Sequence, residues 1–181
     1  MLKRNIVFVM SFSLAMILLP SNNYAQFEIN KNYAGPVIGL AFLGSTVQFG
    51  ANYEYGMELK DLPGKIGVGG LFRYWGYHEN FAHGNWSYTN ILVGAQGNYH
   101  FKISGGKYDP FFGLVLAFDI GSVSWSGEEK YRFAEPSHGG FFLGAHAGAR
   151  YWFSPNMAVL ALVNFGTLGY GGLDIGLDFK F

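Results

Sequence analysis

The 181-residue sequence contains no cysteine, which excludes disulfide bridges, thiolate metal sites and the acylated cysteine of bacterial lipoproteins. Charged residues make up only 13 %, about half the share of a soluble domain. No segment after residue 25 approaches 18 consecutive apolar residues, so a membrane-spanning helix is not expected there. Residues 26–181 also lack a basic excess, with ten basic and twelve acidic side chains, which argues against a nucleic-acid-binding surface.

Glycine and aromatic residues are abundant instead. The chain has 27 glycines, and Phe, Tyr and Trp together make up 19 %. This composition is too apolar and aromatic for the surface of an ordinary soluble domain. It is compatible with a β-barrel whose outer wall faces lipid.

The first residues have the pattern of a secretory signal. Lys3 and Arg4 precede an apolar stretch over 6–19, which is followed by Pro20 and a polar segment. This pattern predicts a cleaved signal peptide over 1–25. The apolar stretch is shorter than the ~20 residues that a spanning helix needs. We expect a short periplasmic segment over 26–34 and a barrel domain over 35–181.

Eight runs with two-residue alternation follow, and each is bounded by turn residues. They cover 35–43, 46–60, 65–78, 86–102, 109–123, 139–153, 156–166 and 171–181. Compact turns rich in Pro, Gly and Asn follow the second, fourth and sixth runs, whereas longer segments, 79–85 and 124–139, follow the third and fifth. Short turns at one rim and longer loops at the other are typical of outer-membrane barrels. The sequence therefore predicts an all-β fold, an eight-stranded antiparallel up-and-down transmembrane β-barrel with extracellular loops at 79–85 and 124–139.

The two faces of these strands differ in polarity. In the final run, the apolar residues from Leu173 to Phe181 alternate with Asp174, Gly176, Asp178 and Lys180. We expect the apolar faces to contact hydrocarbon and the polar faces to fill a closed lumen, in which charges of both signs pair. The predicted lumen network comprises Glu54, Glu58, Arg73, Gln96, His100, Asp119, His146, Arg150, Asp174 and Asp178. The run over 157–165 is apolar on both faces. The sequence offers no explanation for this beyond local packing in the lumen.

Aromatic residues two positions apart recur in the even-numbered runs. Such pairs point to one face, so barrel closure would gather them into a girdle at the periplasmic interface. The predicted girdle consists of Tyr53, Tyr55, Tyr99, Phe101, Tyr151, Phe153, Phe179 and Phe181.

With eight runs and a terminal phenylalanine, the chain resembles the small eight-stranded outer-membrane barrels of the OmpA membrane-domain, OmpX and Opa types. Asp174, Gly176, Phe179 and Phe181 resemble the recognition signal for barrel assembly in that family. The resemblance implies the bacterial outer membrane as location, outer-membrane lipid and the barrel-assembly machinery as partners, and a monomeric state. It leaves the task open, because such families include adhesins, small channels and a few lipid-modifying enzymes.

No constellation of residues predicts catalysis, a cofactor or a metal site. His78 and His83 flank Glu79, for which metal binding or general-base work is a minor alternative. Ser137-His138 lies near Glu128 and Glu129, as a deacylase set would need, but that spacing is loose. His100 and His146 fall on the lumen face and are expected to be hydrogen-bonded there. The favoured hypothesis is a non-enzymatic barrel with a structural or surface-interaction role through the loops 79–85 and 124–139. Within the second loop, Tyr131, Arg132 and Phe133 stand beside charged residues, where contact with an extracellular partner would occur. The alternatives are a narrow channel, a lipid A- or phospholipid-modifying enzyme and, last, a soluble ligand-binding barrel.

Overall fold

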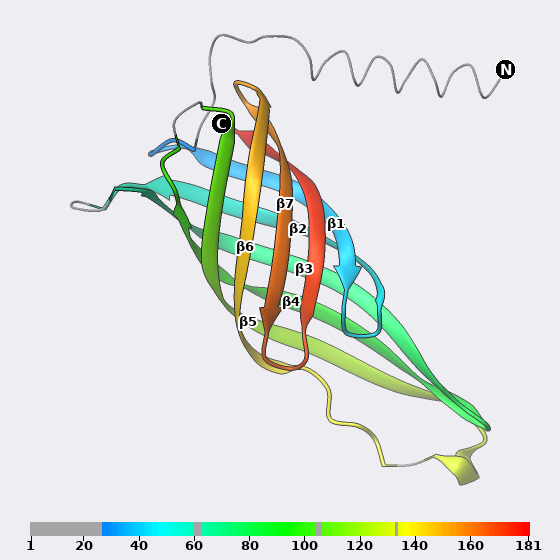
Figure 1. Cartoon of the computed structure of the whole chain (residues 1–181). Helices are drawn as coiled ribbons and strands as arrows, with labels where there is room; N and C mark the ends of the chain where they lie inside the picture. Colours follow the sequence, from blue (N-terminus) through cyan, green and yellow to red (C-terminus); the bar gives the residue numbers. More distant parts are fainter. Residues whose placement is uncertain (1–26, 60–62, 104–105, 133) are drawn as a thin grey trace, which may run out of the picture.

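The chain folds into one closed antiparallel barrel in which each strand pairs with its neighbour in sequence and β8 pairs with β1 (Figure 1). The computed structural model describes residues 27–59, 63–103, 106–132 and 134–181, so the predicted signal peptide and Phe133 lie outside the described residues. The strands are β1 (Asn32–Ala41), β2 (Thr46–Met57), β3 (Lys65–Phe81), β4 (Gly84–His100), β5 (Tyr108–Gly127), β6 (Gly140–Ser154), β7 (Met157–Gly166) and β8 (Gly171–Lys180). This topology confirms the predicted fold class.

Two features of the described residues complete the element list. A single 3-10 turn, η1 (Glu129–Tyr131), lies in the β5–β6 connection. Among these residues, no helix is long and apolar enough to cross a membrane. β1 begins at Asn32, three residues before the predicted run over 35–43.

The wall alternates strictly between an apolar exterior and a filled interior. On β5, Phe112, Leu114 and Leu116 are exposed, whereas Phe111 and Val115 are buried. The same alternation on the other strands turns a continuous belt of Phe, Leu, Ile and Val outward. Such a belt is stable in hydrocarbon and unfavourable in water, because burying or exposing apolar area changes the free energy by about 25 cal/mol per Å².

Glycines on the inner face make room for large polar neighbours. A Cβ atom added to Gly67 would lie 1.6 Å from Oε1 of Glu54, and one added to Gly113 would lie 2.0 Å from Oδ1 of Asn98. An eight-stranded barrel has an interior only wide enough for side chains, so these positions leave space for the network inside.

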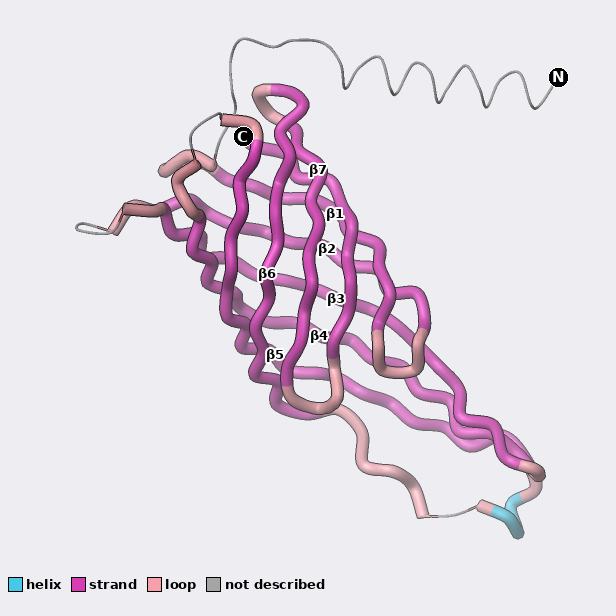
Figure 2. Tube along the Cα trace, in the orientation of Figure 1, coloured by secondary structure: helices cyan, strands magenta, loops and turns pink. Residues whose placement is uncertain are grey.

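The strands differ in length, and three of them extend beyond the barrel. Pairing of β2 with β3 stops at Gln48 and Trp75, and pairing of β5 with β6 stops at Asp119 and Gly140. Beyond these pairs, 76–81 of β3, 84–89 of β4 and 122–127 of β5 continue as a three-stranded sheet, here called the flap (Figure 2). The expected loop over 79–85 is therefore a hairpin tip with a two-residue turn, and the expected loop over 124–139 is reduced to 128–139.

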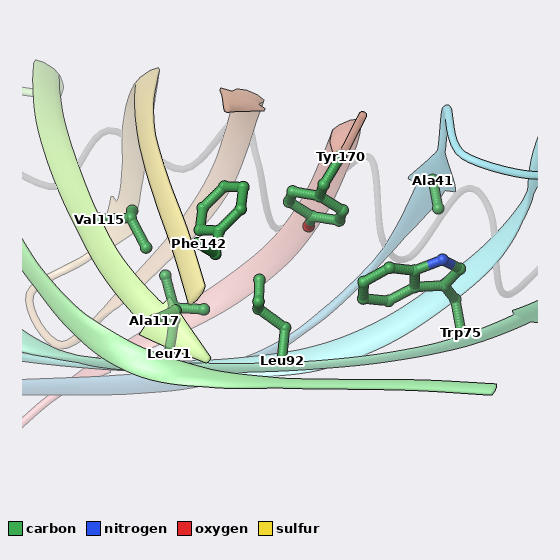
Figure 3. Close-up of a cluster of buried hydrophobic side chains, with 8 residues drawn as sticks. All are labelled: Ala41, Leu71, Trp75, Leu92, Val115, Ala117, Phe142 and Tyr170. Atoms are coloured by element: carbon green, nitrogen blue, oxygen red, sulfur yellow. The ribbon is translucent and has the colours of Figure 1, made fainter. Parts of the chain in front are cut away.

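Apolar clusters divide the interior into layers. The largest lies toward the flap and packs Trp75, Leu92, Phe142 and Tyr170 across the lumen (Figure 3). A second cluster contains Val37, Phe111, Leu160 and Leu162, and a third contains Phe27, Tyr33, Trp152 and Ala158. The inward apolar residues of β7, Ala158, Leu160 and Leu162, belong to these two smaller clusters, which explains why β7 is apolar on both faces as far as Asn164.

Candidate functional site

The most highly charged part of the lumen is centred on Arg150, whose side chain is 2 % exposed. Its guanidinium donates to Glu54 Oε2 at 2.5 Å, to Asp178 Oδ2 at 2.5 Å and to Asp109 Oδ2 at 3.3 Å. The three carboxylates come from β2, β8 and β5, so this one side chain links distant parts of the wall. A planar fork of five donors suits such a junction.

His100 completes the Arg150 network. Its Nε2 lies 2.7 Å from Glu54 Oε1 and its Nδ1 lies 2.8 Å from Asp109 Oδ1. The imidazole ring thus bridges Glu54 and Asp109, two of the three carboxylates that also bind Arg150. Asn98 also donates to Glu54 at 2.9 Å, and His146 donates to Asn98 at 2.6 Å.

A second network surrounds Asp174. Arg73 Nε donates to its Oδ2 at 3.0 Å, Asn164 donates to the same oxygen at 3.0 Å, and Gln48 donates to Oδ1 at 2.5 Å. Arg73 Nη1 donates further to the carbonyls of Ala51 and Phe72. The side chains of Gln48, Arg73, Asn164 and Asp174 are buried, so the ion pair and its hydrogen bonds close this level of the lumen to solvent.

The third polar group lies at the mouth below the flap. With its amide oriented so that each atom has a partner, Asn90 donates to Asp119 Oδ2 at 2.9 Å and to His138 Nε2 at 2.7 Å, and accepts from Trp75 Nε1 at 3.2 Å. His138 comes from the 128–139 connection, so that connection covers this mouth. The other carboxylate oxygen, Asp119 Oδ1, is buried with no hydrogen-bond partner among the described residues.

The structure brings most of the predicted lumen residues together. The Arg150 network contains Glu54, His100, His146 and Asp178, the Asp174 network contains Arg73, and Asp119 lies in the third group. Gln96 is buried but donates to the carbonyl of Tyr53 rather than to a charge. The expectation for Glu58 is corrected: it is exposed and follows the end of β2 at Met57, where the alternation stops.

Asp109 is the main functional residue that the sequence analysis missed. It begins the predicted run over 109–123 but is absent from the predicted lumen network, and in the structure it points inward from β5 with Phe111 and Gly113. The two-residue alternation that places Gly113 and Phe111 on the inner face also places Asp109 there. Gln48, Asn98 and Asn164 occupy inward positions that the same alternation identifies.

The N-terminal segment closes the opposite mouth. Phe27 is 2 % exposed and stacks on His100 with a centroid distance of 3.6 Å. The carbonyl of Phe27 accepts a hydrogen bond from Lys65 Nζ, and the Glu28 carboxylate pairs with Lys180 Nζ at 2.6 Å. Nothing in the polar sequence around Phe27 indicates this inserted position.

The two faces of the flap differ. Its inner face carries Tyr77, Trp86, Tyr88 and Trp125, and Tyr77 stacks on Tyr88 at 4.5 Å. The 128–139 connection packs against this face, since Arg132 lies over the Trp86 ring. The outer face carries small polar side chains, Ser87, Thr89, Ser122, Ser124 and Ser126. The lipid-facing belt thus gives way to a surface suited to water.

The predicted girdle residues lie at the rim that holds the β2–β3, β4–β5 and β6–β7 connections, here called the turn rim. They are the exposed or half-exposed Tyr53, Tyr55, Tyr99, Phe101, Tyr151, Phe153, Phe179 and Phe181. Tyr53 and Tyr55 donate to Asn32 and Asn30 at 2.8 and 3.1 Å. Amphipathic rings at this level are typical of a bilayer interface.

The histidines considered for catalysis do not form a site with the acids proposed for them. His78 Nδ1 lies 2.8 Å from Ser87 Oγ, whereas Glu79 accepts from Tyr88 at 2.8 Å. His83 stacks on Tyr131. Among the described residues, no group of three His, Asp or Glu side chains is arranged to hold a metal ion.

A closed antiparallel wall with an apolar exterior, an aromatic rim and a lumen filled by ion pairs defines the class of small transmembrane β-barrels. The solved structures that the chain is similar to share this fold. Neisserial surface protein A has a TM-score of 0.54 with 20 % identity, covering 83 % of this chain and 96 % of that one. The N-terminal β-barrel domain of Pseudomonas aeruginosa OprF has a TM-score of 0.51 with 20 % identity, covering 84 % and 98 %.

The attachment invasion locus protein Ail of Yersinia pestis, in complex with the heparin analogue sucrose octasulfate, is a further similar structure. It has a TM-score of 0.54 with 16 % identity, covering 85 % of this chain and all of that one. No protein-family model matches the sequence, and no curated protein matches it. The expected likeness to small eight-stranded barrels is thereby confirmed for the fold.

Proposed function

We propose that the chain is a monomeric, non-enzymatic barrel of the bacterial outer membrane that contacts extracellular partners through the flap and the 128–139 connection. The observation that carries this proposal is the continuation of β3, β4 and β5 beyond the level at which their outer barrel neighbours end. A sheet that only had to cross the bilayer needs about 9–11 residues per strand, whereas β5 has 20.

The free edge of the flap suits contact with another chain. Residues 76–80 of β3 pair with β4 on one side, and on the other side the pairing with β2 ends at Trp75. An unpaired strand edge offers backbone donors and acceptors to an added strand. Neisserial surface protein A and the attachment invasion locus protein bear names that describe surface and attachment roles, which supports the same class of function here.

The orientation is tested by labelling single cysteines, which the cysteine-free chain makes simple. Ser124→Cys lies on the outer face of the flap, and Asn156→Cys lies in the β6–β7 turn. We expect a membrane-impermeant maleimide to label Ser124→Cys on intact cells and Asn156→Cys only after permeabilisation. The reverse pattern contradicts the proposed orientation.

The contact role is tested by photo-crosslinking from the free edge. A photoreactive residue in place of His78 is expected to give a defined adduct on intact cells in the native environment. The control position is Asn156. Equal adducts at both positions, or none at 78, contradict a role for the flap.

A sealed lumen supports the absence of channel activity. The Arg150 network, the Asp174 network and the apolar clusters follow one another along the lumen, and Phe27 closes the turn rim. Single-channel recording of the reconstituted protein is expected to show no stable conductance. A steady nanosiemens conductance favours the narrow-channel alternative.

The dispersed histidines support a non-enzymatic role. His138 is engaged with Asn90, and Ser137 is exposed on the same connection. We expect the lipid A and phospholipid profiles to be unchanged on overexpression. A changed profile that His138→Ala abolishes contradicts this expectation.

A further inference from the structure

Positive charge is concentrated at one end of the barrel. Five of the six lysines among the described residues lie at the turn rim, namely Lys31, Lys65, Lys102, Lys107 and Lys180. At the flap end, Lys130 and Arg132 are outnumbered by Glu79, Glu128, Glu129 and Glu135. Both ends of the barrel are exposed to headgroups or water. The excess of lysines at the turn rim and of glutamates at the flap end therefore favours binding of anions at the turn rim.

A cavity of about 310 Å³ opens at this rim. Its lining includes Lys65, Lys102, Glu58, Phe101 and Tyr108, with the stacked rings of Phe27 and His100 at the boundary with the sealed lumen. Two ammonium groups and one exposed carboxylate give the lining a positive balance, because Asp109, which also lines it, is paired with His100 and Arg150.

The cavity borders the lipid-facing wall. Lys102 lies between Phe101 and Ile103, whose side chains are 47 % and 43 % exposed, and Tyr108 is 62 % exposed. These apolar groups fix the level of the hydrocarbon boundary, and a lysine between them places its ammonium among the headgroups. Lys65 lies deeper, where one of its three donors binds the Phe27 carbonyl.

We propose that this cavity binds the headgroup of phosphatidylglycerol from the adjoining phospholipid leaflet. Lys65 and Lys102 hold the phosphate, and Glu58 accepts a hydrogen bond from a glycerol hydroxyl. The acyl chains follow the wall beside Phe101 and Tyr108. The inference rests on the barrel spanning a bilayer with this rim at the phospholipid leaflet, and it is independent of any role for the flap.

The test is native mass spectrometry of the full mature barrel released from nanodiscs that contain equal parts of phosphatidylglycerol, phosphatidylethanolamine and phosphatidylcholine. We expect preferential retention of phosphatidylglycerol. Lys102→Gln should lower that retention about fivefold, the effect of removing one cation near an anionic headgroup. Glu58→Gln keeps a hydrogen-bond acceptor but removes the nearby negative charge, so it should raise retention.

Two lysines outside the cavity serve as controls that distinguish binding in the cavity from non-specific attraction by positive charge. Lys31→Gln changes the same rim outside the cavity, and Lys130→Gln changes the flap end; both should leave retention unchanged. If Lys31→Gln and Lys102→Gln lower phosphatidylglycerol retention equally, the binding is diffuse electrostatic attraction to the rim, and the proposed cavity site is overturned. Equal retention of the three lipids also overturns a phospholipid site, and binding of free glycerol phosphate in that case assigns the cavity to a soluble phosphate. Heat-modifiable gel migration checks that each variant is folded.

Discussion

A single guanidinium joins three carboxylates inside this barrel. Arg150 contacts Glu54, Asp109 and Asp178, so its removal leaves negative charges facing one another at low solvent exposure. Removing one partner of a buried ion pair is far more costly than replacing the whole pair, because the remaining charge is uncompensated.

We therefore expect Arg150→Leu to lower the free energy of unfolding by about 3–5 kcal/mol, measured by urea unfolding in lipid vesicles. Lys130→Gln removes an exposed cation that pairs with the exposed Glu128 and lies over the Tyr131 ring, and it should change stability by less than about 0.5 kcal/mol. If both variants unfold at the same urea concentration, the network does not stabilise the barrel.

Two glycines offer a matched pair for the interior and the exterior. A Cβ at position 67 would collide with the Glu54 carboxylate, whereas one at position 97 would meet no atom within 4 Å. Gly67→Ala should destabilise the barrel by about 1–3 kcal/mol through overpacking. Gly97→Ala should be neutral or slightly stabilising, because alanine restricts the unfolded chain. Similar unfolding midpoints for the two variants would show that the lumen is less tightly packed than described.

At the scale of the strands, the sequence predicts the features that contact with hydrocarbon requires, namely the strands themselves and their apolar outward faces. Period-two alternation between Phe112 and Ile120 indicates both the strand and its outward face, because hydrocarbon contacts every second side chain there. Toward the flap this alternation of apolar residues ends, so the polar tip over 79–85 has the sequence pattern of a loop although it continues β3 and β4. The pairing partners across the lumen are also not readable, since they depend on closure of the wall.

A charge on the lipid-facing wall tests where the membrane lies along β5. Leu114→Arg lies in the apolar belt and should cost about 2–4 kcal/mol of stability in vesicles. Ser124→Arg, on the same face of β5 but within the flap, should cost close to nothing. An equal cost at both positions would place the flap inside the bilayer.

For the whole molecule, closure depends on the pairing of β1 with β8. The amide nitrogen and carbonyl of Phe181 bind the carbonyl and amide nitrogen of Asn32, both at 3.0 Å, while the Phe181 side chain is 65 % exposed. The residue thus combines two roles, a backbone contribution to the seam and an aromatic group at the interface.

Deleting Phe181 should reduce insertion into the outer membrane, observed as loss of heat-modifiable migration. Phe181→Ala keeps both backbone bonds and removes only the ring. If the aromatic end serves recognition by the assembly machinery, Phe181→Ala should be impaired in cells but should fold normally into synthetic vesicles. Normal insertion of the deletion variant in cells would contradict both roles.

The same seam determines when the chain can fold. Every strand needs two neighbours, and the neighbours of β1 are β2 and the last strand of the barrel. Until β8 is present, the growing sheet has two open edges, and closing a ring across almost the entire barrel sequence carries a large entropic cost. The barrel can therefore close only after the last strand of the sequence has paired with the first, and we expect closure to be a late step of folding.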